Sequence, residues 1–466
     1  MRTGRHRRRL VVACAILVFA VALGFGLGFG ITTQLRHATA KPAPPRPSLP
    51  VALGAVTAAP SPDPAAAGGP AGTAATPQGV RAAIGSLAHA PGLGARLLAR
   101  VIDARTGRVL FDQAGSTAAA PASTGKLLTA AAILAVRRPT DRFTTTVLDA
   151  GHGTVVLVGG GDPTLAAARP GKPTTYPDAA RLSALAAQVR AHHVTVRRIV
   201  VDDSLFFGPS VSPHWDATDI GTNYAAPITA LMGDAAVIRP PGYARSTAPD
   251  LDAAKAFAAL LGKPGLPIRT GRTPAGTTKL AQVESAPVAA LVDQMLQTSD
   301  NVIADVLARQ VAIAVHQPAS FTGAVTAIRT VLGKLGVQVG DGMKDGSGLS
   351  SADRVSPAAL AGVLRLIAGY GPPAAAQVRL VAAELPVGGW SGTLAERYTD
   401  GAEHFAAGRV RAKTGTLSTV SSLAGLVRDK SGRLLVFAFD ADRAVGTYGA
   451  EAALDAITAR LARCGC

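Results

Sequence analysis

The chain has 466 residues, of which 48% are hydrophobic and only 4% aromatic, and its formal net charge at pH 7 is +17. This length allows two domains and a large buried core. Beyond the first nine residues the basic side chains are scattered, without clusters or interleaved aromatic residues. Composition therefore argues against a nucleic-acid partner and favours contact with an anionic cell wall or membrane surface.

The N-terminal segment predicts a membrane anchor. Five arginines precede residue 10, and residues 10–31 carry no charge. As a helix rising about 1.5 Å per residue, this stretch spans about 33 Å, enough to cross a bilayer. Residues 1–40 are thus expected to form a cytoplasmic tip and a single membrane-spanning helix, with the rest outside the cytoplasm. The alternative is a signal peptide cleaved after Ala40, which would release a secreted protein.

Residues 41–78 have the composition of a linker. Residues 41–77 contain ten of the 32 prolines and otherwise mostly small residues, a mixture that cannot bury a core. After the linker we expect a catalytic domain built from residues 79–149 and 282–466. Residues 150–281, which mix short strand-like pieces with Pro and Gly turns, are expected to form an inserted domain.

Hydrophobic patterns predict the helices and strands of these two domains. A hairpin is predicted at 97–103 and 108–112, followed by a helix at 123–136. The insertion is expected to hold strands at 198–202 and 235–239 and a helix at 179–191. The C-terminal part is expected to contain helices at 301–315, 352–369, 372–383 and 448–462, and strands at 410–416, 420–428 and 434–440.

Ser123 and Lys126 form the first chemical motif. They precede an apolar run, so the spacing predicts a helix whose first turn carries Ser123 with Lys126 on the same face. A serine hydroxyl needs an adjacent base to become nucleophilic, and a helix start offers free N–H groups to an oxyanion. Taken alone, the pair is weak evidence, because such a spacing is more typical of a capping serine and a solvated lysine.

Two later motifs strengthen the catalytic interpretation. Ser299-Asp300-Asn301 precedes an apolar helical run, and Lys413-Thr414-Gly415-Thr416 lies in a strand-like segment. In chain order the three motifs read S-x-x-K, S-D-N and K-T-G, the set of class A β-lactamases and penicillin-binding proteins. Only ten of the 47 basic residues are lysines, and arginine could not act as a base because its guanidinium does not lose a proton.

With these motifs the chain resembles the serine-type D-alanyl-D-alanine carboxypeptidases of the peptidase S13 family, the class C low-molecular-mass penicillin-binding proteins. The resemblance extends over about residues 80–466 and includes the stretches 157–163, 224–227 and 345–350. It implies an α/β (α+β) fold of the penicillin-binding-protein and β-lactamase type, in which helices cover an antiparallel sheet and a second domain is inserted. The Gly/Ser-rich stretch 345–350 either borders the site or is a simple turn.

The resemblance also implies the role of each motif residue. Ser123 would attack the peptide, and Lys126 would take its proton once desolvation and the nearby charge of Lys413 have lowered the lysine pKa. Ser299 would relay the proton to the leaving amine. The substrate would be bound by Asn301, Lys413, Thr414, Gly415 and Thr416, with the N–H groups of Ser123 and Thr416 as the oxyanion hole.

The expected substrates are peptidoglycan stem peptides ending in D-Ala-D-Ala, with β-lactams as covalent inhibitors. No cofactor is expected, and no metal, because the nine histidines lack ligand spacing. Three alternatives stay open: cleavage of cross-links as an endopeptidase, turnover of penicillin as a β-lactamase, or a non-catalytic scaffold that binds the wall. A Ser-His-Asp hydrolase is disfavoured because no Gly-x-Ser-x-Gly motif frames a serine.

Overall fold

The computed structural model describes residues 75–240 and 242–466. The predicted membrane helix and almost all of the linker lie outside these residues. The last linker residues do not fit the prediction, because Ala75 is buried and Thr76 caps the helix α2, Pro77–Ile84, by accepting a hydrogen bond from Gly79 N. Within the described part, every helix is too short or too polar to cross a bilayer.

An antiparallel sheet forms the centre of one half of the described chain. Its strands are ordered β2-β1-β10-β9-β8, and each neighbouring pair runs antiparallel. The strands are β1 (Leu97–Asp103), β2 (Val109–Gln113), β8 (Val410–Leu417), β9 (Val420–Arg428) and β10 (Leu434–Ala441). The predicted N-terminal hairpin and the three C-terminal strands are confirmed.

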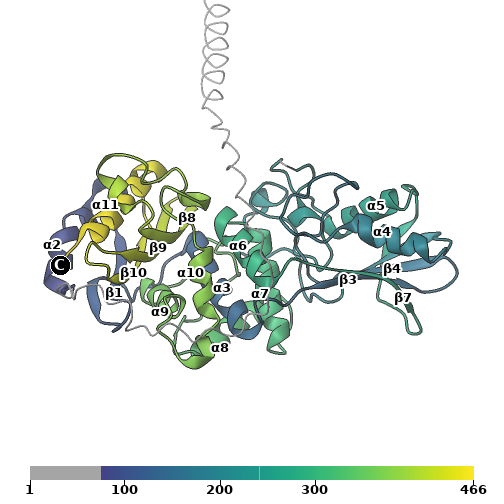
Figure 1. The fold of residues 1–466 in the computed structure, drawn as a ribbon, viewed down its shortest axis with the longest axis horizontal. Helices are drawn as coiled ribbons and strands as arrows, with labels where there is room; N and C mark the ends of the chain where they lie inside the picture. Colours follow the sequence, from purple (N-terminus) through teal and green to yellow (C-terminus); the bar gives the residue numbers. More distant parts are fainter. Residues whose placement is uncertain (1–74, 241) are drawn as a thin grey trace, which may run out of the picture. The chain divides into compact units, whose positions relative to one another are not determined.

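Helices cover both faces of this first sheet (Figure 1). Because side chains alternate along a strand, Phe437 and Phe439 of β10 pack on one face, with α11 (Thr447–Arg463) and α2. Val436 and Ala438 point the other way, into the core formed with α9 (Pro357–Ile367). This arrangement buries two layers of apolar side chains against one sheet.

A group of helices lies beside the face of the first sheet that α9 covers. Its centre is α3 (Lys126–Val136), whose residues 126–134 are all buried, as expected of a helix that is apolar all round. The helix α3 contacts its neighbours α6 (Val288–Thr298), α7 (Asn301–Ala314) and α8 (Phe321–Lys334). The helix predicted at 352–369 begins only at Pro357, which Ser356 caps. The one predicted at 372–383 is broken into short turns and α10 (Val381–Glu384).

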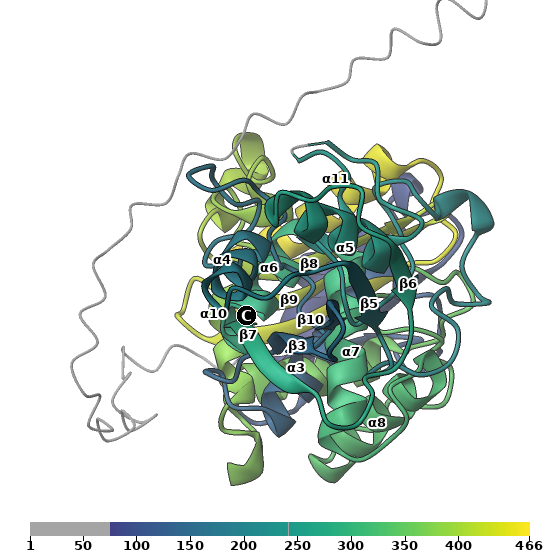
Figure 2. The same cartoon turned by 90° about the vertical axis from the view of Figure 1, so that its right-hand side faces the viewer.

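A second, mixed sheet forms the other half, with strand order β6-β5-β4-β3-β7. Its strands are β3 (Thr144–Asp149), β4 (Thr154–Val158), β5 (Arg198–Asp202), β6 (Ile268–Thr270) and β7 (Thr278–Glu284). The helices α4 (Leu182–Ala191) and α5 (Pro249–Leu260) pack against it and share its separate core (Figure 2). The sheet begins before residue 150 and ends after residue 281, because β3 and β7 pair with each other along their length.

The strand predicted at 235–239 is absent from the second sheet. In its place, Asp234, Ala235 and Ala236 form a tight turn with positive φ angles, a conformation that cannot extend as a strand. The remaining predicted elements of this half, the strand at 198–202 and the helix ending at residue 191, are present.

Candidate active site

Ser123 lies on a short 3-10 helix, Ala122–Gly125, immediately before α3. The prediction that Ser123 belongs to the first turn of the α-helix is therefore wrong by one turn. Ala122 has a φ of 48°, and this left-handed residue breaks the helical path just before the serine. Ala122 and Thr124 are buried, whereas Ser123 is partly exposed, so the turn presents the serine side chain outward.

Lys126 places its ammonium group against the serine. Its Nζ atom donates hydrogen bonds to Ser123 Oγ at 2.8 Å, Asn301 Oδ1 at 2.5 Å and the Ser347 carbonyl at 2.8 Å. An ammonium has three N–H groups, one for each acceptor. Once deprotonated, the amine keeps two of these donors, and its lone pair can accept the hydrogen of the Ser123 hydroxyl. The geometry thus suits a serine nucleophile and a lysine base.

Burial lowers the pKa of Lys126 to about 8, because the fully buried ammonium loses its hydration. Nearby carboxylates, first Asp345 and then Asp305, act in the opposite direction. Of the two expected causes, desolvation is therefore the principal one, and the charge of Lys413 is not among the main contributions. The like-charge effect instead acts on Lys413, whose pKa is lowered well below its ordinary value by burial and then by Lys126.

The second motif forms a corner between two helices. Ser299, with a φ of 59°, ends α6, and Asp300 caps α7 by accepting hydrogen bonds from Val302 N and Ile303 N at 2.8 and 3.0 Å. Asn301 is consequently the first residue of α7, in contact with Lys126. Ser299 is partly exposed, and its side chain has no hydrogen bond within the described residues.

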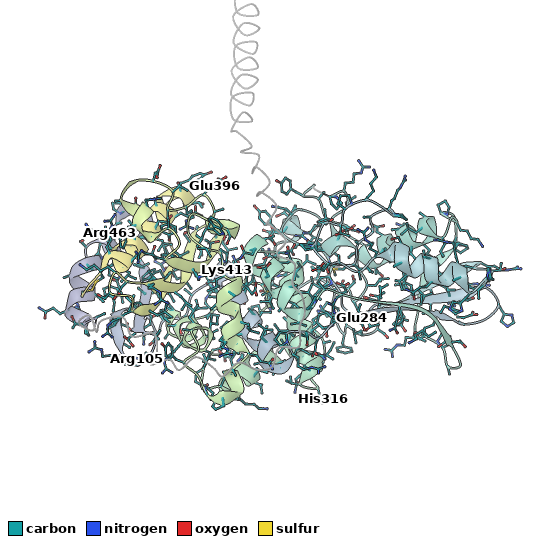
Figure 3. The ribbon with its side chains drawn as sticks, in the orientation of Figure 1. Arg105, Glu284, His316, Glu396, Lys413 and Arg463 are labelled. Atoms are coloured by element: carbon teal, nitrogen blue, oxygen red, sulfur yellow. A yellow bond between two sulfur atoms is a disulfide. The ribbon has the colours of Figure 1, made fainter. Side chains whose placement is uncertain are left out.

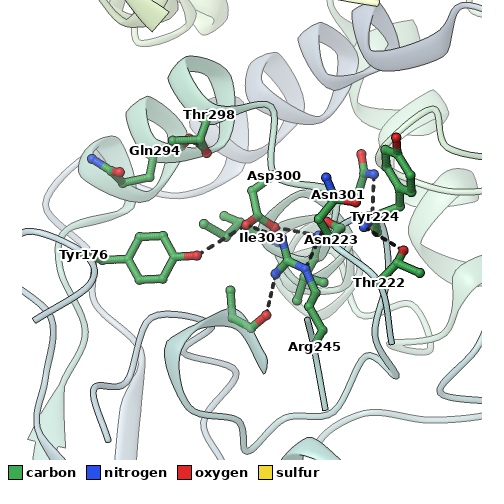
Figure 4. A network of polar contacts seen from close by, with 12 residues as sticks. Tyr176, Thr222, Asn223, Tyr224, Arg245, Gln294, Thr298, Asp300, Asn301 and Ile303 are labelled. Atoms are coloured by element: carbon green, nitrogen blue, oxygen red, sulfur yellow. Dashed lines mark hydrogen bonds and ion pairs between the residues drawn. The ribbon is translucent and has the colours of Figure 1, made fainter. Parts of the chain in front are cut away.

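Residues from the second-sheet half, the part of the chain between β3 and β7, hold this corner in place (Figure 4). Asp300 Oδ2 accepts hydrogen bonds from Arg245 Nη2 at 2.9 Å and from the Tyr176 hydroxyl at 3.3 Å. Asn301 Nδ2 donates to the Tyr224 carbonyl at 2.9 Å. The Asp300–Arg245 pair is buried, so loss of either partner would leave an unpaired charge and disturb the start of α7.

The third motif lies on β8, which ends the first sheet beside β9 and also forms an isolated bridge from Arg411 to Val387. Lys413 is fully buried near the middle of the molecule (Figure 3), and its Nζ donates to the Thr414 carbonyl at 2.8 Å. Thr416 is exposed and Thr414 is partly exposed. Thr414 Oγ1 donates to Thr393 Oγ1 at 2.8 Å, and Thr416 Oγ1 donates to Glu451 Oε1 at 3.4 Å. The strand thus presents two hydroxyl groups, with a buried lysine behind them.

Gly415 brings β8 against the serine turn. A Cβ atom at this position would lie 2.9 Å from Ser123 N, 2.9 Å from the Pro121 carbonyl and 2.3 Å from Ser422 Oγ. No side chain fits there, because real Cβ contacts are longer. The glycine thus allows β8 to approach the backbone N–H of Ser123, the geometry an oxyanion hole between Ser123 and Thr416 requires.

The stretch 345–350 borders the site, as one of its two interpretations held. Its Ser347 carbonyl accepts from Lys126, and its Gly346 carbonyl accepts from Thr129 Oγ1 at 2.6 Å. Gly348 has a φ of 77° and packs so closely on Ala122 that a Cβ would lie 1.9 Å from the Ala122 carbonyl. This loop therefore supports both the lysine and the serine turn.

Comparison with known proteins agrees with this geometry. Residues 80–244 and 239–464 match the D-Ala-D-Ala carboxypeptidase 3 (S13) family. The chain belongs to this family. It is 41% identical to a carboxypeptidase of Mycobacterium tuberculosis over 99% of this chain and 98% of that one. It is 40% identical to carboxypeptidase DacB of Mycolicibacterium smegmatis over 100% of both chains.

The fold is shared with a solved structure, penicillin binding protein 4 of Haemophilus influenzae. The TM-score is 0.67 at 22% identity, over 82% of this chain and 98% of that one. The predicted fold class is therefore confirmed. Family membership likewise makes the chain a serine D-Ala-D-Ala carboxypeptidase, in preference to a β-lactamase or a scaffold.

Sequence reasoning missed a shell of buried aspartates around Lys126 of this carboxypeptidase. Asp345 accepts hydrogen bonds from Trp215 Nε1, from the Ser347 hydroxyl and from three backbone N–H groups of its own loop. Asp305, one turn after Asn301 on α7, accepts from Gly346 N at 2.7 Å. The carboxylates thus hold the loop that carries the Ser347 carbonyl.

Asp305 and Asp353 are buried carboxyl groups with raised pKa values. Burial, then the nearby Asp345, raises the pKa of Asp305 to about 8 and that of Asp353 well above its ordinary value. Each has one carboxyl oxygen without a hydrogen-bond partner in the described chain. The spacing of Asp305 four residues after Asn301, on the same helix face, was the available sequence signal.

Proposed function

We propose that Ser123 and Lys126 carry out the family's hydrolysis of D-Ala-D-Ala through an acyl-enzyme. Neutral Lys126 takes the hydroxyl proton as Ser123 Oγ bonds to the carbonyl carbon between the two D-alanines. The backbone N–H groups of Ser123 and Thr416 hold the resulting oxyanion. The observation that carries this proposal is a fully buried Nζ, 2.8 Å from Ser123 Oγ, with a pKa lowered to about 8.

The proton then passes to the leaving group through Ser299. Its hydroxyl has no other partner in the described chain, so it is free to accept from Lys126 and donate to the leaving amine. The C–N bond breaks, and D-alanine departs with the transferred proton. Water next adds to the acyl carbon, gives one proton to Lys126 and releases the shortened peptide as Ser123 recovers its hydrogen.

Substrate recognition is assigned to β8 and Asn301. The Thr414 and Thr416 hydroxyls turn from Thr393 and Glu451 to donate to the terminal carboxylate, and Lys413 supplies a positive charge behind them once the carboxylate is bound. Asn301 uses one N–H and one oxygen lone pair for Tyr224 and Lys126, so its second N–H and lone pair remain for a substrate amide. This assignment predicts a preference for substrates that end in a free carboxylate.

Replacement of Ser123 tests the nucleophile. We expect Ser123→Ala to lose covalent labelling by a fluorescent penicillin, because β-lactams acylate the same hydroxyl. A penicillin-binding protein of this fold has been captured with a β-lactam, which supports the choice of reagent. Ser431→Ala, on an exposed turn, is the matched control and should label normally. Labelling of Ser123→Ala at the wild-type level would exclude Ser123 as the nucleophile.

The same chemistry serves two peptidoglycan substrates. A carboxypeptidase releases D-alanine from an uncrosslinked stem peptide, whereas an endopeptidase cuts the bond that joins two stems. Incubation of the protein with both kinds of fragment, followed by mass identification of the products, separates these outcomes. We expect free D-alanine from uncrosslinked stems.

The proposed location is the cell membrane, with residues 41–466 outside the cytoplasm. Five arginines before an uncharged stretch at 10–31 support this orientation. Fractionation of expressing cells should find the protein with the membrane. A mature protein in the medium that begins at Lys41 would instead demonstrate cleavage and secretion.

The second-sheet half is proposed to be an inserted domain. It has its own sheet and its own apolar core, with residues such as Leu157 and Phe257. Its position in the sequence, between Lys126 and Ser299, fits an insertion into the catalytic domain. It also supplies Arg245 and Tyr176 to the Asp300 corner, so the insertion supports the active site.

A further inference from the structure

A turn in the second-sheet half has a strained backbone. Asp234, Ala235 and Ala236 have consecutive φ angles of 50°, 51° and 67°, a conformation that non-glycine residues rarely adopt. The turn is held from outside, because Asp234 N donates to the Leu165 carbonyl at 2.9 Å and Ala235 N donates to the Pro163 carbonyl at 2.7 Å. Strain that its surroundings maintain in this way often marks a functional site.

The turn buries the carboxylate of Asp234, which is only 4% exposed. Its Oδ2 accepts a hydrogen bond from Ala167 N at 3.0 Å, whereas Oδ1 has no partner among the described residues. Burial raises the pKa of Asp234, whereas the Thr175 side chain and Ala167 N–H act in the opposite direction. A buried acceptor without a donor is unfavourable, and a donor supplied by a ligand would relieve this.

Asp234 lies in the wall of a pocket of about 650 Å³, a volume typical of small-molecule sites. Part of the lining is apolar, including Val237 and Ile238. Two basic residues, Arg169 and Lys172, also line the pocket and are exposed. Neither forms a salt bridge within the described ranges. One pocket thus combines a buried acid with two unpaired surface cations.

Arg245 connects this turn to the active-site corner (Figure 4). Its guanidinium donates to the Ala235 carbonyl and, at 2.9 Å, to Asp300 Oδ2. Asp300 caps α7, which begins with Asn301. A ligand held at the turn would therefore contact a structure that also positions the second catalytic motif.

We propose that the pocket is a second binding site, separate from Ser123, for a short peptide with free amino and carboxyl ends. The ammonium end reaches Asp234, and the carboxylate end meets Arg169 and Lys172. Apolar side chains of the peptide lie against Val237 and Ile238. Charges of both signs within one partly apolar pocket favour such a zwitterion over a simple cation or anion.

The test uses the full chain in detergent micelles, with Ser123 first acylated by penicillin to block the catalytic site. Tri-L-alanine, its N-acetyl form and its C-terminal amide are titrated by calorimetry. Tri-L-alanine should bind, and blocking either end should weaken binding by about tenfold or more. Failure of tri-L-alanine to bind, or equal binding of the N-acetyl form, would overturn the proposal.

Asp234→Asn identifies the receptor for the amino end. Asparagine tolerates positive φ and keeps an oxygen for Ala167 N, so the turn should stay folded. This variant should lose the preference for the free amine, whereas Asp250→Asn, which lies beside the pocket but does not line it, should keep that preference. Wild-type binding by Asp234→Asn would contradict the assignment.

Arg169→Ala combined with Lys172→Ala should remove the preference for the free carboxylate while the preference for the free amine remains. Acylation at the wild-type rate in each variant shows that the catalytic half is intact. If penicillin fails to acylate the protein at all, the proposed nucleophile is in error. The same titrations on Ser123→Ala then still test the pocket independently.

Discussion

Two fully buried lysines, Lys126 and Lys413, meet different surroundings in this molecule. Burial lowers the pKa of both, because each ammonium has left water. Around Lys126, aspartates on α7 and the 345–350 loop offset part of this effect and leave a pKa of about 8. Around Lys413 no described carboxylate does so, and the charge of Lys126 lowers the pKa further.

This difference assigns separate tasks to the two lysines. A general base works best when its pKa lies near the working pH, and a pKa of about 8 satisfies that condition for Lys126. Lys413 lacks a carboxylate partner of its own in the described chain, so a substrate carboxylate is the anion that would favour its charged form. Burial alone therefore does not define a lysine's role, and the nearby charges decide it.

The largest expected effect comes from removal of the base. Lys126→Ala should slow acylation by penicillin by about 10²- to 10⁴-fold, the usual contribution of a positioned general base. Lys126→Arg should be similarly slow because a guanidinium stays protonated. Acylation rate constants from intact-protein mass spectrometry measure both variants. Lys430→Ala, at an exposed turn, is the control. If Lys126→Ala lowers the acylation rate constant by less than about threefold, Lys126 is not the base.

Removal of Lys413 should give a smaller and selective effect. For a substrate with a free terminal carboxylate, Lys413→Ala should lower kcat/KM by about tenfold to hundredfold, the value of one charge-assisted hydrogen bond. For the same substrate with an amidated end, the variant should lose little. Hydrolysis of the matched pair by both proteins gives the comparison. Equal losses on the two substrates would mean that Lys413 acts on Lys126 rather than on the carboxylate.

A substitution at Gly415 should affect stability more modestly. In Gly415→Ala the new methyl group would overlap Ser422 Oγ and press β8 away from Ser123, at a cost of about 1–3 kcal/mol in the free energy of unfolding. Chemical denaturation measures this cost, and acylation should slow as well. Gly333→Ala, on α8 with open space around it, is the matched control and should not destabilise. Equal stability of the two variants would contradict the tight approach of β8.

The sequence predicted those parts of the fold that depend on local patterns. Alternating apolar residues located the strands of the first sheet. The first two motifs located Ser123 and Asn301, which meet at Lys126, and the third located Gly415, which lies against Ser123. Local patterns failed where distant contacts decide the conformation. The run 235–239 has strand-like residues, but carbonyl groups of Pro163 and Leu165 hold its first part in a left-handed turn.

The buried charges around the site were also beyond sequence reasoning. Asp300 lies inside a recognised motif, yet its partner Arg245 is 55 positions away in the chain. Asp345 and Asp305 come from a loop and a helix that meet only in the folded protein. No local pattern reports the desolvation of Lys126, and this desolvation is the main cause of its lowered pKa.

The pH dependence of acylation tests the central claim most directly. Lys126 must be neutral to accept the proton of Ser123, and its pKa in the free enzyme is lowered to about 8. The second-order rate constant for acylation by penicillin should therefore rise with pH, reach half its maximum near pH 8 and then level off. This rise with pH should be absent in Lys126→Ala. A wild-type rate constant that does not change with pH through this range, or the same rise in Lys126→Ala, would contradict Lys126 as the base.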